Sequence, residues 1–279
     1  MAKIMILYHA GCPDGFGAAW SFYQKHGSGA TYVPVVHNCK PPNVKGCNVF
    51  IVDFCYPEPI MRKIARDAAS IVVLDHHKTA EKACADLKYC HFDMHQSGAV
   101  LAWKYLFKDI PVPALIQHVQ DRDLWTWAIP NSKEILSVVD SYDRSFANWD
   151  NLNNKIGMIY SSGWYQMVES GRDILKYKNS IIKTVVSNAH KVNILGDEVI
   201  AVNSSCFQSE IGNILSEGAD YAAVYFFDGY RYRFSLRSKE NGIDVSEVAL
   251  EFGGGGHRNA AGFTTESIDS LRMGNKDGE

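Results

Sequence analysis

Three short aliphatic segments, each followed directly by residues that bind metal ions, constrain the fold of this chain more than any other feature. The segments and the residues after them are Lys3–Tyr8 before His9, Asn48–Val52 before Asp53, and Ile71–Leu74 before Asp75, His76 and His77. After the first and second segments come a turn and then residues at helical spacing. Aliphatic strands that alternate with helices are typical of a parallel sheet covered on both faces. The sequence therefore predicts an α/β fold.

The ends of these segments predict a metal site. Ligands bind beyond the carboxyl ends of the strands in an open parallel sheet, so the three ends, with Asp14 in the first loop, should face one crevice. A single strand end of this kind is more simply interpreted as a polar turn after a core strand. Three such ends in register favour a metal site instead. Crowded carboxylates would repel each other, and divalent cations remove that conflict. Oxygen and imidazole ligands suit Mn²⁺ or Mg²⁺ better than structural zinc. Two ions about 3.5–4 Å apart could share and acidify one water.

The middle of the chain is predicted to be helical. Ser97 is expected to cap one helix, and residues 114–127 should form another that runs into an acidic, tryptophan-rich loop. Residues 132–190 lack the alternation of strands. Within them, Asn148–Asn154 is expected to be a surface loop and residues 170–190 a long helix that connects two domains.

A different pattern begins near Val192. Two hairpins are predicted, one turning at Gly196–Asp197 and one at Asp228–Gly229. A helix over Val245–Glu251 then precedes a run of glycines. These patterns predict a metal-binding domain over 1–150, a helical connector over 151–191, a smaller α/β domain with a mixed sheet over 192–268, and a tail over 269–279.

Composition limits the partners and the location. With 28 basic and 31 acidic residues the net charge is −3, so the broad basic surface that binds long duplex nucleic acid is not expected. The cysteines, seven in number, include no CxxC pair, which argues against a disulfide framework and a zinc ribbon. The N-terminal apolar run is too short for a signal peptide, and no apolar stretch has the length of a membrane helix. A cytoplasmic protein without a membrane partner is expected.

Several motifs, taken in their order, carry a resemblance to a known family. HAGCPDGFGAAW, VDF, LDHH and QDRDLW, followed by LRS and GGGGHRNAAGF, resemble the DHH phosphoesterase superfamily, and more narrowly its branch with a C-terminal DHHA1 substrate domain. That branch includes nano-RNA hydrolases, single-strand exonucleases and cyclic-dinucleotide phosphodiesterases. The resemblance runs from about His9 to Phe263, and it implies a DHH catalytic domain over 1–150 and a DHHA1 domain over 192–268.

The resemblance also implies roles for the N-terminal residues. The metal ligands that it implies are His9, Asp14, Asp53, His76 and an aspartate of QDRDLW. Asp53 is expected to bridge two Mn²⁺ ions. In QDRDLW, the family's fourth motif, Asp121 fits better than Asp123, because Trp125 then has the expected offset. Asp75 should orient its neighbour, and His77 should contact phosphate or donate a proton. Trp125 and Trp127 adjoin Asp121 and could stack bases, although core packing is the simpler role.

Cys12 departs from the family pattern. The family's first motif usually has an acidic ligand at the position of Cys12. A thiolate can bind Mn²⁺ but is softer than this ion prefers. Three alternatives stay open: Cys12 is a ligand, water replaces it, or it is a small loop residue beside a weakened metal site.

The C-terminal motifs imply a phosphate clamp. Consecutive glycines let backbone N–H groups approach an anion closely, and an arginine can hold a phosphate through two hydrogen bonds. The residues expected to bind substrate are Arg237, Ser238, Gly254, Gly255, Gly256, His257 and Arg258. For Arg258 a solvated surface role is an equal alternative.

The expected function is Mn²⁺-dependent hydrolysis of short single-stranded RNA or DNA, or of small nucleotides, by a two-metal phosphodiesterase. Near-neutral charge suits a short substrate. The alternatives within enzymes are a phosphatase for 3′-phosphoadenosine-5′-phosphate and a cyclic-nucleotide phosphodiesterase. An alternative of another class is a nucleic-acid-binding module without catalysis, which the loss of several ligands would have favoured. The sequence leaves the oligomeric state open, a homodimer included.

Overall fold

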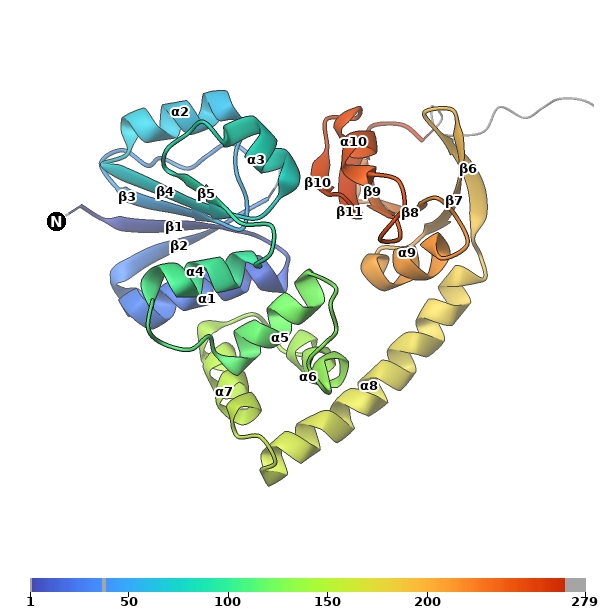
Figure 1. The fold of residues 1–279 in the computed structure, drawn as a ribbon, viewed down its shortest axis with the longest axis horizontal. Helices are drawn as coiled ribbons and strands as arrows, with labels where there is room; N and C mark the ends of the chain where they lie inside the picture. The colour runs from blue at the N-terminus through green and yellow to red at the C-terminus, as the bar shows by residue number, and fades with distance from the viewer. Residues whose placement is uncertain (1, 37–38, 269–279) are drawn as a thin grey trace, which may run out of the picture. The chain divides into compact units, whose positions relative to one another are not determined.

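The chain folds into two compact units, Met1–Lys176 and Tyr177–Glu279 (Figure 1). The structure is a computed structural model, and it describes residues 2–36 and 39–268. The division falls within the helix α8 (Ser162–Val186). This helix overlaps the one predicted over 170–190, but it begins earlier and ends earlier. The predicted tail over 269–279 lies outside the described residues.

The first unit contains a parallel sheet, as predicted. Its strands are β1 (Ile4–His9), β2 (Ala30–Val35), β3 (Asn48–Val52), β4 (Ser70–Asp75) and β5 (Cys90–Phe92). They are ordered β2-β1-β3-β4-β5, and every pair is parallel. The two outer strands were not predicted. Pro34 lowers the strand signal of β2, and an edge strand is where a proline is tolerated.

Helices cover both faces of this sheet (Figure 1). They are α1 (Pro13–His26), α2 (Glu58–Asp67), α3 (Lys78–Cys84) and α4 (Gly98–Leu106), and the 3₁₀ helix η1 (Gly27–Gly29) joins α1 to β2. Ile6, Val52 and Leu74 pack against α1 and α4, while Leu7, Ile51 and Val73 pack against α2 and α3. Burial on both faces explains why the central strands are aliphatic throughout. Ser97 caps α4 as predicted, accepting a hydrogen bond from the amide of Val100.

The remainder of the first unit is helical. It contains α5 (Ala114–Asp123), α6 (Ser132–Asp140), α7 (Phe146–Gly157) and the first part of α8. The surface loop expected over Asn148–Asn154 is wrong, because these residues lie within α7. Trp149, Leu152 and Ile156 recur at helical spacing and are at most 2% exposed, so burial of this face outweighs the low helix propensity of the asparagines.

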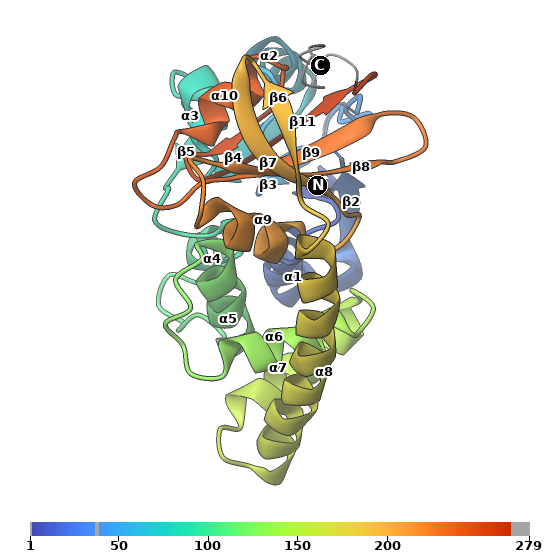
Figure 2. The same cartoon turned by 90° about the vertical axis from the view of Figure 1, so that its right-hand side faces the viewer.

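The second unit contains a mixed sheet, also as predicted. Its elements are β6 (His190–Ile194), β7 (Asp197–Asn203), α9 (Gln208–Ser216), β8 (Ala222–Phe227), β9 (Tyr232–Arg237), α10 (Val245–Leu250), β10 (Gly255–His257) and β11 (Ala260–Thr265). The order is β10-β11-β9-β8-β7-β6, with β7 and β8 parallel and the other pairs antiparallel. Both predicted hairpins are present. Figure 2 shows α9 and α10 on opposite faces of this sheet.

None of the helices in the described part of the chain combines the length and the apolar character needed to cross a membrane.

Candidate active site

The side chains predicted to bind metal meet where three neighbouring strands of the first unit end. His9 is the last residue of β1, Asp53 follows β3, and Asp75 ends β4. Since β1, β3 and β4 are adjacent and parallel, their carboxyl ends lie at one edge of the sheet. The order of the strands therefore brings residues far apart in sequence into one cluster.

Asp53 lies at the centre of this cluster. One carboxylate oxygen, Oδ2, is 3.4 Å from Nδ1 of His9 and 3.2 Å from Sγ of Cys12. The other, Oδ1, is 3.2 Å from Nε2 of His76. Burial alone would raise the pKa of Asp53, but its contacts with His76 and His9 lower this pKa well below the usual value. Asp53 is therefore a carboxylate surrounded by groups that bind cations.

The backbone of Asp53 is strained. Its φ is 62°, in the left-handed region that non-glycine residues rarely adopt. The amide of Asp53 donates to the carbonyl of Leu74, 2.9 Å away, and this bond holds the turn against β4. Such strain persists only where the surrounding structure enforces it, and it is commonest at functional sites.

Asp14 joins the cluster from the first turn of α1. Its carboxylate accepts hydrogen bonds from the amides of Gly98 (2.6 Å) and Ala99 (3.0 Å), so it caps the beginning of α4. Its Oδ2 is also 3.6 Å from Nε2 of His76. Burial, and then the charge of Asp53, raise the pKa of Asp14 well above its usual value.

Gly98 makes the meeting of the two carboxylates possible, and the sequence analysis missed it. A Cβ atom at this position would lie 2.6 Å from Cβ and 2.8 Å from Oδ1 of Asp53, and 3.0 Å from Oδ2 of Asp14. The glycine beside the predicted cap Ser97 was the available signal. It could not be interpreted without knowing that α4 begins beside Asp53.

The cluster has the properties that a divalent cation requires. Oδ1 of Asp53 is buried and accepts no hydrogen bond with regular geometry within residues 2–36 and 39–268. Burial opposes the protonation of His76, but Asp53, Asp123 and Asp14 raise its pKa to about 10. The groups of donor atoms that could each hold an ion include His9–Cys12–Asp53, Asp14–His76–Asp123 and Asp53–Asp75–His77. Carboxylates crowded in this way repel each other when ionised, and a bound cation would remove that repulsion.

The structure brings Asp123, and not Asp121, to this cluster. Oδ2 of Asp123 is 3.5 Å from Nε2 of His76, and its side chain is 30% exposed. The carboxylate of Asp121 instead accepts hydrogen bonds from Thr126, Ala128 and Ile129. The choice of Asp121, which rested on its spacing to Trp125, therefore picked the aspartate that shapes the following loop.

Cys12 lies within the cluster and also begins α1. Its Sγ accepts a hydrogen bond from the amide of Gly15 at 3.2 Å and lies 3.3 Å from Nδ1 of His9. Burial, and then Asp53 and Asp14, raise the pKa of the Cys12 thiol well above its usual value. The position suits either a ligand or a cap, so the alternatives stated for Cys12 stay open.

Asp75 and His77 form a buried pair beside the cluster. Oδ1 of Asp75 is 2.7 Å from Nδ1 of His77 and accepts a hydrogen bond from the amide of His76. Burial opposes the protonation of His77, but Asp75 outweighs it and raises the pKa of His77. One carboxylate oxygen of Asp75 therefore contacts the imidazole of His77 and also holds the backbone of His76.

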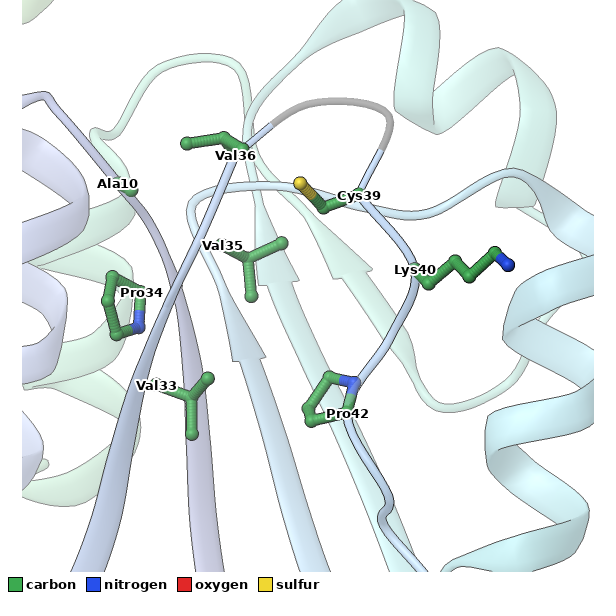
Figure 3. A pocket seen from close by; sticks show the side chains of 8 residues that line it. All are labelled: Ala10, Val33, Pro34, Val35, Val36, Cys39, Lys40 and Pro42. Carbon is green, nitrogen blue, oxygen red and sulfur yellow. The ribbon is translucent and has the colours of Figure 1, made fainter.

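A cavity of about 290 Å³ lies beside β2, lined by Val33–Val36, Cys39 and Lys40 among others (Figure 3). The side chains around it in Figure 3 are mainly aliphatic, and none of the clustered carboxylates or histidines lines it. We therefore locate the site from the chemistry of the cluster and not from this cavity.

In the second unit, Arg237 is held at the end of β9. Its Nη2 donates to Oγ of Ser209 (2.7 Å) in α9, and its Nη1 donates to the carbonyl of Leu236. Gly212 lets the arginine lie against α9, because a Cβ there would be 2.7 Å from Cγ of Arg237. Ser238 is buried, and its hydroxyl donates to the carbonyl of Ile243.

The second half of the glycine run lies in a strand, whereas Gly253 lies in a turn before it. Gly255–His257 form β10, paired with β11. A Cβ on Gly254 would lie 2.2 Å from the carbonyl oxygen of Gly262, and one on Gly256 would lie 2.6 Å from that of Ala260. Close backbone packing thus accounts for two of these glycines. Arg258 is exposed and contacts Gly242 and Asp244.

Comparison with known proteins agrees with this arrangement. Residues 192–273 match the family model of the DHHA1 domain. The chain is 31% identical to an uncharacterized protein of Acanthamoeba polyphaga mimivirus, over 95% of this chain and 68% of that protein. It is 26% identical to oligoribonuclease NrnB of Bacillus subtilis, over 80% of this chain and 61% of that protein.

Two solved structures show the same fold at 14% identity. One is the DHH domain of a member of a ribosomal-protein family, with a TM-score of 0.59 over 96% of this chain and 84% of that one. The other is an exopolyphosphatase-related protein of Bacteroides fragilis, with a TM-score of 0.51 over 95% of this chain and 87% of that one. The order of the motifs, the two folds and the matched DHHA1 region together show that this chain belongs to the DHH/DHHA1 phosphoesterase superfamily.

Proposed function

We propose that this phosphoesterase hydrolyses the phosphodiester bonds of short single-stranded oligonucleotides and requires Mn²⁺. The observation that carries the proposal is the cluster of buried Asp14, Asp53 and His76 with the more exposed His9 and Asp123, at the carboxyl ends of adjacent parallel strands. The name of the Bacillus subtilis relative, an oligoribonuclease, supports the substrate class. The net charge of −3 also suits a short substrate.

In this proposal His9, Asp14, Asp53, His76 and Asp123 would hold two divalent ions. Bound there, the ions would acidify a water and stabilise the charge that develops on the phosphoryl oxygens. The chain keeps the cluster ready for this task, because hydrogen bonds from Gly98 and Ala99 fix Asp14 while the enforced turn at residue 53 fixes Asp53.

His77 is the proposed proton donor to the leaving oxygen. Its Nδ1 faces Asp75, which fixes the ring and favours the protonated form. An imidazole held in this way directs its other nitrogen in one orientation, as a general acid requires. Asp75 acts through His77 and is a positioning residue.

The second unit is proposed to bind the substrate phosphates through Arg237 and His257. The guanidinium of Arg237 already donates to Ser209 and Leu236, so its orientation is set in advance. Ser238 donates a hydrogen bond to Ile243, which favours a role in shaping the turn after β9. Arg258, Gly254, Gly255 and Gly256 are further proposed contacts of the substrate phosphates.

A substrate panel tests the proposal. The purified chain is incubated with di- to pentanucleotides, cyclic dinucleotides and 3′-phosphoadenosine-5′-phosphate, with Mn²⁺ or with excess chelator. We expect Mn²⁺-dependent release of mononucleotides from the linear oligomers, and its abolition in Asp123→Asn. The exposed Asp109→Asn is the matched control. Turnover in excess chelator, or hydrolysis of the bisphosphate alone, would contradict the proposal.

A further inference from the structure

The loop between α5 and α6 carries two tryptophans in an unfavourable backbone conformation. Trp125 has a φ of 56° and Trp127 a φ of 50°. Bulky aromatic residues are rare outliers in this left-handed region, which glycine occupies without cost. Two such residues, separated by one position, require a structure that enforces the conformation.

That structure is built around Asp121, which is 4% exposed. Its backbone carbonyl accepts hydrogen bonds from the amides of Thr126 and Trp127. Its carboxylate accepts from the hydroxyl of Thr126 (2.8 Å) and the amides of Ala128 (2.7 Å) and Ile129 (3.2 Å). The loop is thus wound around one buried carboxylate, and its shape is determined before any ligand arrives.

The two indole rings are placed differently. Trp127 packs against the hydrophobic cluster of the first unit, and its ring centroid lies 5.1 Å from Nζ of Lys133. Its Nε1 is buried, with no hydrogen-bond partner within the part of the chain that the structure describes. Trp125 meets Trp127 edge to face, with ring centroids 5.2 Å apart, and it is 36% exposed. Trp127 therefore supports an aromatic ring that is not itself part of the core.

The loop begins directly at the cluster of carboxylates and histidines. Trp125 follows Asp123 by two positions, so their Cα atoms are at most about 7–8 Å apart. Asp123 in turn lies 3.5 Å from His76. An aromatic surface this near to the reacting phosphodiester is within reach of a base of the same substrate.

We propose that Trp125 is the surface on which a nucleobase of the substrate stacks, and that Asp121 is the positioning residue that holds the loop for it. This inference rests on the proposed function and adds a substrate requirement: a base beside the cleaved phosphodiester. Stacking needs only a π face, so any base should bind, with purines favoured over pyrimidines by their larger rings.

Trp125→Gly is the sharpest variant, because glycine adopts the left-handed backbone without cost and so should preserve the loop. We expect KM for a dinucleotide to rise about tenfold, with little change in kcat and a melting temperature near that of the wild type. Trp125→Phe should recover part of the affinity. Tyr165→Ala, an exposed aromatic residue of the same unit, is the matched control and should leave KM unchanged.

The decisive comparison uses an analogue of the dinucleotide that keeps the phosphodiester but lacks the base. Trp125→Gly should leave its KM unchanged, whereas a merely structural role would raise both values equally. Asp121→Asn should raise KM for the dinucleotide alone in the same way.

Equal KM values for wild type and Trp125→Gly on the dinucleotide would overturn the inference while leaving the proposed function intact. If Trp125→Gly does not fold, quenching of tryptophan fluorescence by a non-hydrolysable dinucleotide, lost in Trp125→Phe, decides the question. Failure of the wild type to cleave any oligonucleotide would count against the proposed function itself.

Discussion

A Cβ atom at residue 98 would overlap the side chain of Asp53, with 2.6 Å between the two Cβ atoms. Gly98→Ala should therefore displace Asp53 or Asp14. A displacement of about 1 Å at a catalytic group can reduce the rate roughly a hundredfold. We expect a loss of this size together with weaker Mn²⁺ binding, measured as turnover and as bound manganese.

Gly157→Ala is the control for this change, because a Cβ there meets no atom within 4 Å. It should retain wild-type rates. If Gly98→Ala bound manganese and turned over as the wild type does, the two carboxylates would not need their observed spacing.

The pairing of Asp75 with His77 makes a prediction about pH. Asp75 raises the pKa of His77, so the imidazole stays protonated to higher pH than an ordinary histidine. Asp75→Asn removes the negative charge and lowers that pKa. Because the protonated form is the proposed donor, the alkaline limb of kcat should move to lower pH. The pH–rate profiles of wild type, Asp75→Asn and Asp109→Asn test this, and an unmoved alkaline limb would exclude His77 as the donor.

At the level of residues, the sequence predicted that the ends of three strands meet in one cluster, but it favoured Asp121 over Asp123, which is the one beside His76. Two positions along a helix correspond to a rotation of roughly 200°, so these carboxylates point in nearly opposite directions from the end of α5. Which of them faces His76 depends on how α5 packs against α1 and α4. That packing is a tertiary property, and no local pattern records it.

At the level of elements, the close contact between α9 and β9 sets the orientation of Arg237. Gly212→Ala would place a Cβ 2.7 Å from Cγ of Arg237 and should turn the guanidinium away from Ser209. We expect kcat/KM for oligonucleotides to fall roughly ten- to a hundredfold without loss of bound manganese. Gly218→Ala, where a Cβ meets open space, is the control. Equal kcat/KM values in both variants would mean that Arg237 does not hold the substrate.

Two elements escaped the sequence for separate physical reasons. The asparagines of α7 have low helix propensity, so the sequence did not predict this helix. Its stability comes from burying Trp149, Leu152 and Ile156. The glycine run has no alternation of side chains that would predict a strand, yet its lack of side chains lets Gly254 lie against Gly262 and Gly256 of β10 lie against Ala260. The three central strands of the first sheet and the two hairpins, in contrast, depend on local composition and were predicted, with the first turn one residue earlier than expected.

For the whole molecule, the division into two units predicts a selective response to metal. The proposed ligands lie in Met1–Lys176, which has its own hydrophobic clusters, as has Tyr177–Glu279. Mn²⁺ at a hundred times its Kd should stabilise the first unit by about 2.7 kcal/mol, a rise in its melting temperature of roughly 5–10 °C. Calorimetry with Mn²⁺ and with chelator should show this rise in one transition only. An equal rise in both transitions would contradict the placement of the ligands.

The turn at Asp53 has a consequence for the history of such chains. The left-handed backbone at residue 53 acts against folding and glycine would relieve it, whereas the contacts of the carboxylate with His76 and His9 favour aspartate. These contacts and the proposed reaction both oppose that replacement. Once a descendant no longer needs to cleave its substrate, a substitution of Asp53 should be among the first to be accepted. A glycine or asparagine in place of Asp53 would therefore mark a lineage that kept the fold and abandoned the reaction.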